Sequence, residues 1–334
     1  VQNVDPGFKI IPSIYAPGKD ADPHEYAKSP VVRRALQHPS CYRLPDGRRV
    51  LSMWRSESQP PQWWKTVLAD LKKDGIDVAL LGHFNSPFDE LKKFGDVAWA
   101  MTIWGTRSPQ WDYAWPRAGR KLTDVVGTPI AAQDIRTRGQ SLWEAENFDT
   151  LRSLWHSARK HDADYAFIIS WNDFSEQAQM PSERVGYALH DLNAYYTTWF
   201  KTGRQPAIVR DVLYYSYRRQ HSQTRHTMGK PYTFRDDGGR LGDKAAVNKI
   251  ELLAFLTEPG TLTVEAGGKT YTKKAPAGIT SFKVPMPTEG EFRPVFTLVR
   301  DGRVVVTGKG RTLVTDRINF PDLLYNCGVI AGDD

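Results

Sequence analysis

The chain has 334 residues, of which 40% are hydrophobic and 25% charged, as expected of a folded globular protein rather than a disordered one. Its net charge of +7 comes from scattered basic residues and not from a basic stripe, which argues against a nucleic-acid partner. No apolar run reaches the roughly 18 residues of a membrane span. No signal peptide is visible at the start, as in a protein whose leader has been removed.

The cysteines and short motifs exclude several kinds of site. Two cysteines, Cys41 and Cys327, are too few for a disulfide-dense scaffold or a cysteine-rich zinc site, and the sequence leaves their pairing open. The zinc-protease, P-loop, dinucleotide and serine-hydrolase motifs are all absent. His156 and His161 are five residues apart, so they do not share one face of a helix. We therefore expect no metal and no cofactor.

The first 219 residues alternate short apolar runs with amphipathic stretches. Two stretches, 63–73 and 148–161, carry apolar residues at helical spacing. Strand and helix in alternation predict an α/β domain with a parallel sheet covered by helices. The predicted strands are apolar throughout, as in sheets that are buried on both faces. They lie at residues 8–15, 50–54, 78–83, 97–103, 129–133 and 165–171.

The number of predicted strands does not decide whether the sheet closes into a barrel. A (β/α)8 TIM-type barrel needs eight strands, and only six precede residue 172. Either the sheet is open, or two β/α units belong to a missing N-terminal segment or a second chain that completes the barrel. We expect a barrel whose first strands are missing from this chain.

The remainder of the chain differs in composition. All 11 tryptophans of the protein lie at or before Trp199. A helix is predicted at 186–201, where Gly203 suits a helix C-cap, and an aromatic strand at 208–218. Residues 220–248 are predicted to be a linker. From residue 249 to residue 334, short strands separated by Gly, Pro and Asp-Gly turns predict an all-β sandwich domain.

Polar and aromatic residues follow several predicted strands, where a parallel barrel places its active site. Each of them also has an ordinary explanation as a hydrogen-bonded rim residue. The candidates at strand ends are Tyr15, Glu57, Trp104, and Gln133 with Asp134.

The richest of these segments is 167–181, FIISWNDFSEQAQMP. Asp173 and Glu176 follow a buried strand and are three residues apart, so both can point into one pocket. Glycoside cleavage needs two carboxyl groups, one to protonate the leaving oxygen and one to activate water or attack the anomeric carbon. Trp171 offers a ring for stacking on a sugar, and Asn172 offers an amide. The alternative is a capping box, with Asp173 as N-cap and Glu176 at the third helical position.

The segment ISWNDFSE at 169–176 resembles the strand-end motif of glycoside hydrolase family 71, the α-1,3-glucanases or mutanases, whose usual form is Trp-Asn-Asp-Tyr-Gly-Glu-Ser. The downstream helix at 187–203 and the segment 206–218 are also similar to this family, and the likeness is looser at 38–53 and 254–278. Phe174-Ser175 and Gln177 depart from the motif. Family 99 endo-α-mannosidases have a distantly similar strand end, Trp-Asn-Glu-Trp.

The resemblance implies a (β/α)8 barrel, a β-sandwich, and hydrolysis of an α-glucan without metal or cofactor. It assigns Asp173 and Glu176 as the acid/base pair and implies an inverting mechanism. Which of the two is the acid stays open, and the departures put the α-1,3 linkage in question more than the glycosidase chemistry.

Our hypothesis is a secreted or cell-surface endo-acting α-glycosidase with a polysaccharide substrate and no nucleic-acid partner. The residues predicted to bind substrate are Trp171, Asn172, His190, Trp143, Trp104, Glu57, Tyr15 and Gln133. His190 is equally well explained as an ordinary helix residue. Two other classes stay open, namely an inactive carbohydrate-binding protein and a surface scaffold. Core packing is predicted for three tryptophans on apolar helix faces, Trp64, Trp155 and Trp199.

Overall fold

The computed structural model describes residues 4–14, 17–86, 88–180, 182–235 and 245–331. The chain forms two compact units. Unit 1 comprises Val1–Gly105, Tyr113–Pro129 and Lys160–Phe167, and unit 2 comprises Thr106–Asp112, Ile130–Arg159 and Ile168–Asp334.

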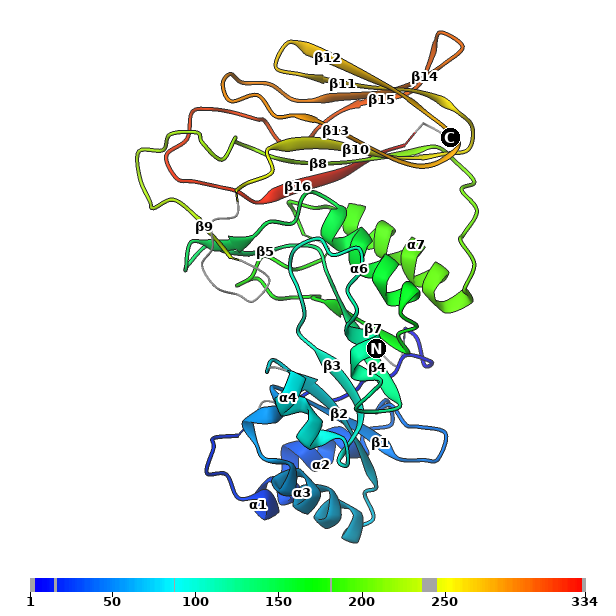
Figure 1. Cartoon of the computed structure of the whole chain (residues 1–334), viewed down its shortest axis with the longest axis vertical. Coiled ribbons are helices and arrows are strands. Elements are labelled where there is room, and N and C mark those ends of the chain that lie inside the picture. Colours follow the sequence, from blue (N-terminus) through cyan, green and yellow to red (C-terminus); the bar gives the residue numbers. More distant parts are fainter. Residues whose placement is uncertain (1–3, 15–16, 87, 181, 236–244, 332–334) are drawn as a thin grey trace. The chain divides into compact units, whose positions relative to one another are not determined.

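A parallel sheet of five strands, in the order β1-β2-β3-β4-β7, dominates the first half of the chain (Figure 1). Every residue of β2 is buried, as the unbroken apolar run predicted, whereas β7 is half-buried and exposes Ile168. Five of the six predicted strands are therefore present. They are β1 (Arg49–Trp54), β2 (Val78–Phe84), β3 (Ala98–Ile103), β4 (Val125–Ala131) and β7 (Tyr165–Ile169).

The first predicted strand is wrong. The segment lies beside β1, but it makes only two isolated parallel bridges, Ile10 with Cys41 and Ser13 with Ser52. Pro12 separates the two bridges, and it has no N–H to donate to a continuous ladder. Its carbonyl still accepts the Ser52 N–H at 2.8 Å. The segment is thus an irregular edge, and its last residue, Tyr15, lies outside the described residues.

The predicted strand at 129–133 begins too late. β4 starts at Val125 and passes through Gly127, where a Cβ would stand 2.2 Å from Cζ of Tyr165. The glycine that weakens the apolar pattern therefore makes room for a neighbouring ring. The chain beyond β4 forms a second, three-stranded sheet, β5 (Asp134–Arg136), β6 (Ser141–Trp143) and β9 (Thr233–Arg235).

Helices pack on the sheet of unit 1 through apolar faces. Trp64 and Leu71 of α3 are fully buried with Leu36 of α2 against Leu80 and Met101 of the sheet. The helices predicted near 63–73 and 148–161 are confirmed as α3 and α6. The helices of the first half are α1 (Pro23–Lys28), α2 (Pro30–Gln37), α3 (Pro61–Lys73), α4 (Phe88–Leu91), α5 (Trp115–Gly119) and α6 (Asp149–Lys160), with 3-10 turns η1 (Ser56–Ser58) and η2 (Lys92–Phe94).

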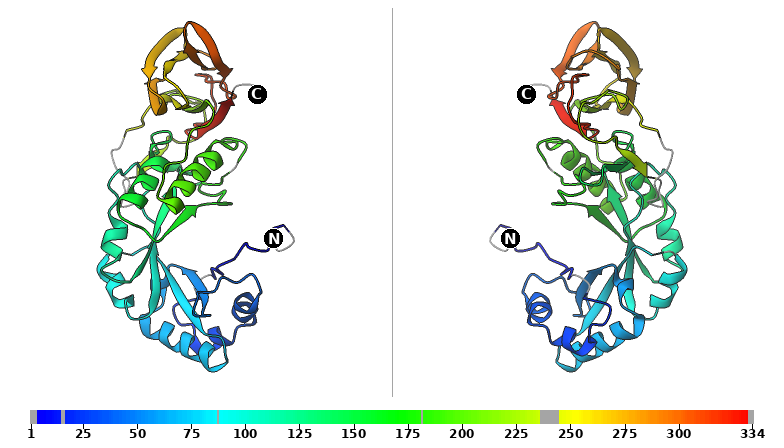
Figure 2. Two further views of the ribbon diagram at one scale, coloured as in Figure 1. Left: turned by 90° about the vertical axis from the view of Figure 1, so that its right-hand side faces the viewer. Right: turned by 90° about the vertical axis from the view of Figure 1, so that its left-hand side faces the viewer.

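Unit 2 carries two antiparallel four-stranded sheets that face each other, β13-β10-β8-β16 and β12-β11-β14-β15 (Figures 1 and 2). Their inner faces share one core, in which the rings of Tyr215 and Phe296 stack with their centroids 5.2 Å apart. The strands are β8 (Val212–Arg218), β10 (Lys249–Leu256), β11 (Gly260–Ala266), β12 (Lys269–Ala275), β13 (Gly278–Pro285), β14 (Val295–Arg300), β15 (Arg303–Lys309) and β16 (Tyr325–Ala331).

The long helix predicted before the sandwich is α7, Ala188–Thr202. Gly203 follows it at φ +68°, a left-handed C-cap that glycine adopts without strain, as predicted. Cys41 and Cys327 are both buried and unpaired. Among the described helices, none is long and apolar enough to cross a membrane.

Candidate active site

The segment after β7 folds back on itself before α7. The Ser170 N–H donates to the Ala178 carbonyl at 3.2 Å, and the Met180 N–H donates to the Ser170 carbonyl at 3.2 Å. These two bonds close a loop that starts and ends at the carboxyl end of β7. Asp173 and Glu176 both lie in this loop.

Asp173 stabilises a turn within the loop. Its Oδ1 accepts the N–H of Ser175 and of Glu176, each at 3.1 Å, and the Ser175 hydroxyl at 2.7 Å. The described residues between this turn and α7 form no helix, and the Asp173 N–H donates to Ser170 Oγ at 2.9 Å rather than to Glu176. The capping-box alternative therefore explains one oxygen of Asp173 and leaves the Glu176 carboxylate unexplained.

The Glu176 carboxyl group points to β5. Its Oε1 lies 2.6 Å from Nη2 of Arg136, and its carbonyl accepts the Ile135 N–H at 2.8 Å. The side chain is 14% exposed. Within the described part of the chain, Oε2 is buried and has no hydrogen-bond partner. One oxygen is thus held in place, while the other is left for a ligand or a proton.

A third carboxylate lies behind this pair. Asp134 is fully buried, and Arg136 donates to both of its oxygens at 3.0 Å through Nε and Nη2. Nε of Arg107, itself buried, lies 3.6 Å from Oδ2 of Asp134. We call Arg107, Asp134, Arg136, Asp173 and Glu176 the acid cluster. Among the described residues, its three carboxyl groups face two guanidinium groups.

Burial and the excess of carboxyl groups together favour the protonated form of Glu176. Burial raises the pKa of Glu176 to about 7, and the negative charges of Asp134 and Asp173 add to the rise, against the attraction of Arg136. The hydrogen bond to Asp134 in turn raises the pKa of Arg136, which stays charged. Near neutral pH, Glu176 can therefore hold and release a proton beside a second carboxylate, the property that general acid–base catalysis requires.

Trp171 and His190 come together beside the loop. They line one pocket of about 220 Å3 with Ile168, Met180 and Asn193. Trp171 is 73% exposed, so its ring is available for stacking. His190 is exposed on α7, and Asn172 is also exposed in the loop. The structure thus brings two of the predicted substrate-binding residues, Trp171 and His190, to one pocket.

Trp143 and Gln133 are buried and engaged with protein groups. The Trp143 ring lies against the guanidinium groups of Arg136, at 5.0 Å, and Arg235, at 5.4 Å. The Gln133 amide donates to the Gln177 carbonyl and accepts the Tyr325 N–H, both at 3.3 Å. In this arrangement Trp143 supports Arg136, and Gln133 anchors the loop that carries Glu176.

Glu57 and Trp104 belong to unit 1. Glu57 Oε1 accepts the Asn85 N–H at 3.0 Å and the Ser86 hydroxyl at 3.1 Å, so this carboxylate ties two strand ends together. The Trp104 ring packs on Trp54, with centroids 4.4 Å apart. His83 and Phe167 pack on the same ring at 5.4 Å and 6.1 Å. Trp104 is thus part of an aromatic group at the carboxyl ends of the parallel strands.

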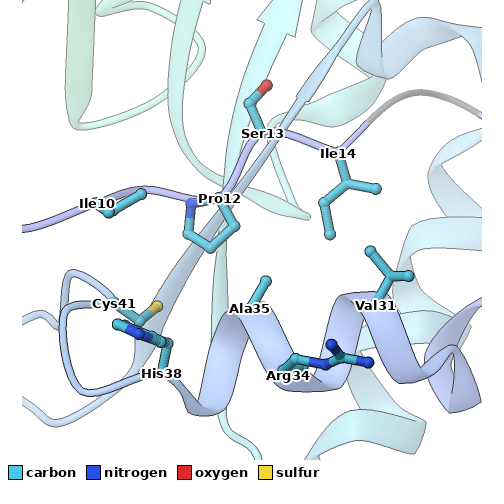
Figure 3. Close-up of a pocket in the computed structure, with 9 residues that line it drawn as sticks. All are labelled: Ile10, Pro12, Ser13, Ile14, Val31, Arg34, Ala35, His38 and Cys41. Carbon is cyan, nitrogen blue, oxygen red and sulfur yellow. The ribbon is translucent and has the colours of Figure 1, made fainter.

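Unit 1 also contains a wider hollow of about 500 Å3 between the edge segment and α2 (Figure 3). Its lining is mostly aliphatic, and Figure 3 shows Ile10, Pro12 and Ile14 above Val31 and Ala35. His38 and Arg34 are the charged or titratable side chains there besides the Cys41 thiol. Without a carboxyl group this hollow lacks the chemistry of the acid cluster.

The sequence pattern did not identify Arg107 and Arg136 as members of the site, and it gave Asp134 no specific role. Asp134 and Arg136 alternate directly after β4, so they project from the same face of β5. An acid and a base at that spacing beyond a buried strand are a signal that could have been used. Arg107 has no comparable signal, because only folding brings it to Asp134.

Comparison with known proteins identifies the class of this site. Residues 132–332 match the family described as glycosyl hydrolase family 71. The matched region is more than half of the chain and includes Asp134, Arg136, Asp173 and Glu176. The acid cluster thus belongs to a glycosidase. The chain belongs to glycosyl hydrolase family 71, and the resemblance read from 169–218 is confirmed.

Curated relatives agree with this assignment. The chain is 26% identical over 332 residues to a glucan endo-1,3-alpha-glucosidase of Schizosaccharomyces pombe, which covers 90% of this chain and 74% of the relative. It is 28% identical over 212 residues to a mutanase of Penicillium rubens, which covers 56% of this chain and 42% of the relative. The chain therefore spans about three quarters of one relative and less than half of the other.

Among solved structures, the chain is similar to the family 99 endo-alpha-mannosidase of Bacteroides thetaiotaomicron. The TM-score is 0.48 and the sequence identity 17%, over 59% of this chain and 67% of that chain.

Proposed function

We propose that the chain hydrolyses an α-glucan, and that the substrate is an α-1,3-glucan. The observation that carries this proposal is the acid cluster, in which a carboxyl group with a pKa of about 7 lies beside a second carboxylate in one short loop. The names of the two relatives, a glucan endo-1,3-alpha-glucosidase and a mutanase, support the linkage.

In the proposed mechanism Glu176 is the general acid. It is protonated near neutral pH because of burial and neighbouring negative charge, and it passes this proton to the glycosidic oxygen as the bond breaks. Arg136 fixes the direction of the carboxyl group through Oε1, which leaves Oε2 for the proton. Asp134 contributes as the buried charge that disfavours ionisation of Glu176.

Asp173 is the proposed general base. Its Oδ1 is occupied by three donors from the turn, and Oδ2 is left to accept a proton from the attacking water. Water activation by a base on the opposite face of the sugar inverts the anomeric configuration, in line with the inverting mechanism that the family resemblance implies.

The substrate-binding roles follow from exposure. Trp171 presents its ring to a sugar, and His190 offers a hydrogen bond in the same pocket. Asn172, exposed in the loop, offers its amide. Trp143 and Gln133 act indirectly, because the first supports Arg136 and the second holds the loop. Trp104 and Glu57 are proposed to contact substrate at strand ends in unit 1. Tyr15, which lies outside the described residues, is proposed to contact substrate as well.

We also propose that the parallel sheet is part of a (β/α)8 barrel that further β/α elements complete. The sheet order β1-β2-β3-β4 follows the chain order, as each strand of such a barrel joins the previous one. The predicted division into a barrel, a linker and a sandwich belongs to the same proposal, except that β8, which lies before the predicted boundary at 219, pairs with β10 and β16 and so belongs to the sandwich. A secreted or cell-surface location fits a polymeric substrate, which cannot cross a membrane to reach an enzyme.

Product analysis tests the function. The protein is incubated with α-1,3-glucan, α-1,4-glucan, α-1,6-glucan and an α-mannan, and the released sugars are identified. We expect products from α-1,3-glucan. Glu176→Gln should abolish release, while Glu183→Gln, at an exposed glutamate on the chain beyond the loop, should retain it.

Three results would decide against the proposal or part of it. Release from another polymer alone would correct the linkage. Equal release by Glu176→Gln and the parent would remove Glu176 from the mechanism. Binding of a glucan without any release would identify an inactive carbohydrate-binding protein.

A further inference from the structure

A second pocket of about 220 Å3 lies in unit 2 between α6 and α7, and the reader can follow these two helices in Figure 1. It shares no lining residue with the acid cluster or with the Trp171 pocket. The residues that matter for its chemistry are Trp111, Arg152, His156, Arg159, Trp199 and Gln205.

Two indole rings form the walls of this pocket. Trp111 is 47% exposed, a large value for the largest apolar side chain. Trp199 is half-buried and stacks on Tyr196 at 15° between the ring planes. Trp155, fully buried below them, donates from Nε1 to Asn193 Oδ1 at 2.8 Å. The prediction of core packing is thus confirmed for Trp155, whereas Trp199 lines a surface pocket.

Cationic side chains hold both walls in position. The guanidinium group of Arg159 lies 4.0 Å from the centre of the Trp199 ring, and that of Arg152 lies 5.6 Å from the Trp111 ring. The His156 ring is 5.9 Å from Trp111. A guanidinium group over an indole ring is attracted to the negative face of that ring. The rings are therefore oriented before any ligand arrives.

The lining suits a neutral polar ring. It contains no carboxylate, and the charge of Arg152 is already balanced by Asp149 at 3.3 Å and Glu251 at 3.7 Å. Indole faces pack on the C–H face of a sugar, while guanidinium, imidazole and amide groups donate to its hydroxyls. The volume is below the roughly 300–1,000 Å3 of pockets that enclose a drug-sized ligand, so one ring of a longer chain fits.

We propose that this pocket is a second, non-catalytic carbohydrate-binding site that holds a neutral α-glucan chain. The proposal rests on the proposed function and adds a binding site to it. A second contact on the same polymer raises the local concentration of substrate at the acid cluster without any new catalytic group.

Binding to insoluble α-1,3-glucan tests this site. All proteins carry Glu176→Gln so that the polymer is not degraded, and depletion from solution gives the affinity. Trp111→Ala should weaken binding about tenfold, and Trp111→Tyr, which keeps a ring, should restore most of it. Phe320→Ala is the matched control, because Phe320 is a 60% exposed ring outside the pocket.

High salt distinguishes binding through ring stacking from binding through the charges of the arginines. At about 1 M salt the Debye length is about 3 Å, so adsorption through the arginines would disappear. The difference between Trp111→Ala and its parent should persist there. In the catalytically intact protein, Trp111→Ala should lose several times more activity on the polymer than on a short soluble oligosaccharide.

The outcomes are distinguishable from those of the proposed function. Equal binding by Trp111→Ala and its parent, or a difference that vanishes at high salt, would overturn this inference while hydrolysis by the intact protein stands. If the intact protein releases no sugar and its Glu176→Gln form binds no glucan, the proposed function fails, and this inference fails with it.

Discussion

Two of the clusters of carboxyl groups and arginines in unit 2 differ in how completely they are satisfied. In the first, Glu144 accepts both Nη atoms of Arg218 at 3.0 and 3.2 Å, together with the Tyr325 hydroxyl at 2.7 Å. The N–H groups of Glu146 and Val247 complete its shell. One acid thus meets one buried base, and both oxygens are used.

In the acid cluster, by contrast, the carboxyl groups are incompletely satisfied. Three carboxyl groups share two arginines, Oε2 of Glu176 has no partner within the described residues, and the side chain still reaches solvent. Both clusters bury an acid beside an arginine, and only the acid cluster combines an excess of acid over base with access to solvent. On this difference we base the proposal that the acid cluster is the catalytic one.

The largest expected effect lies in the satisfied cluster. Glu144→Gln removes the charge that Arg218 is paired with, and breaking a buried pair costs about 3–5 kcal/mol. Denaturant titration should show a fall in the free energy of unfolding of that size. Glu265→Gln, at an exposed position of β11, should change it by less than about 0.5 kcal/mol. A small loss in Glu144→Gln would contradict a structural role for this cluster.

Substitution in the acid cluster should affect catalysis instead of folding. Glu176→Gln and Asp173→Asn should each lower kcat on α-1,3-glucan by about 10² or more, the contribution of general acid–base catalysis. Their melting temperatures should stay close to that of the parent. If either variant unfolds as readily as Glu144→Gln, or if kcat is unchanged, the contrast between the two clusters is wrong for that residue.

The pH dependence of stability should also separate the clusters. Because the pKa of Glu176 rises from an ordinary value of 4.5 to about 7, the folded state binds this proton more tightly than the unfolded state. Stability should therefore fall as the pH rises from about 4.5 to about 7. Thermal unfolding in Glu176→Gln should lack this part of the decline. A decline of equal size in the variant would assign it to other groups.

Much of the fold could be predicted from local patterns, and the exceptions have physical causes. Apolar runs and helical spacing indicated α3, α6 and most strands. Gly328 lies inside strand β16, where a Cβ would stand 2.2 Å from the Tyr215 hydroxyl. A contact with a residue distant in sequence thus requires glycine at a strand position that glycine locally disfavours.

The site could be predicted only as far as it is contiguous in sequence. Asp173 and Glu176 share one loop, so their spacing and the resemblance were sufficient to nominate them. Their difference in role depends on Asp134 and Arg136, about forty residues earlier, and on Arg107. The charge balance of a folded cluster cannot be counted from a sequence without knowing which residues meet.

The pH profile of kcat/KM on α-1,3-glucan tests the central claim most directly. The account predicts that activity falls above a pKa of about 7, as Glu176 loses its proton. In Arg136→Met this fall should move to higher pH, because the positive charge of Arg136 lowers the pKa of Glu176. A profile without a fall near pH 7, or one that Arg136→Met leaves in place, would contradict the assignment of Glu176 as the acid.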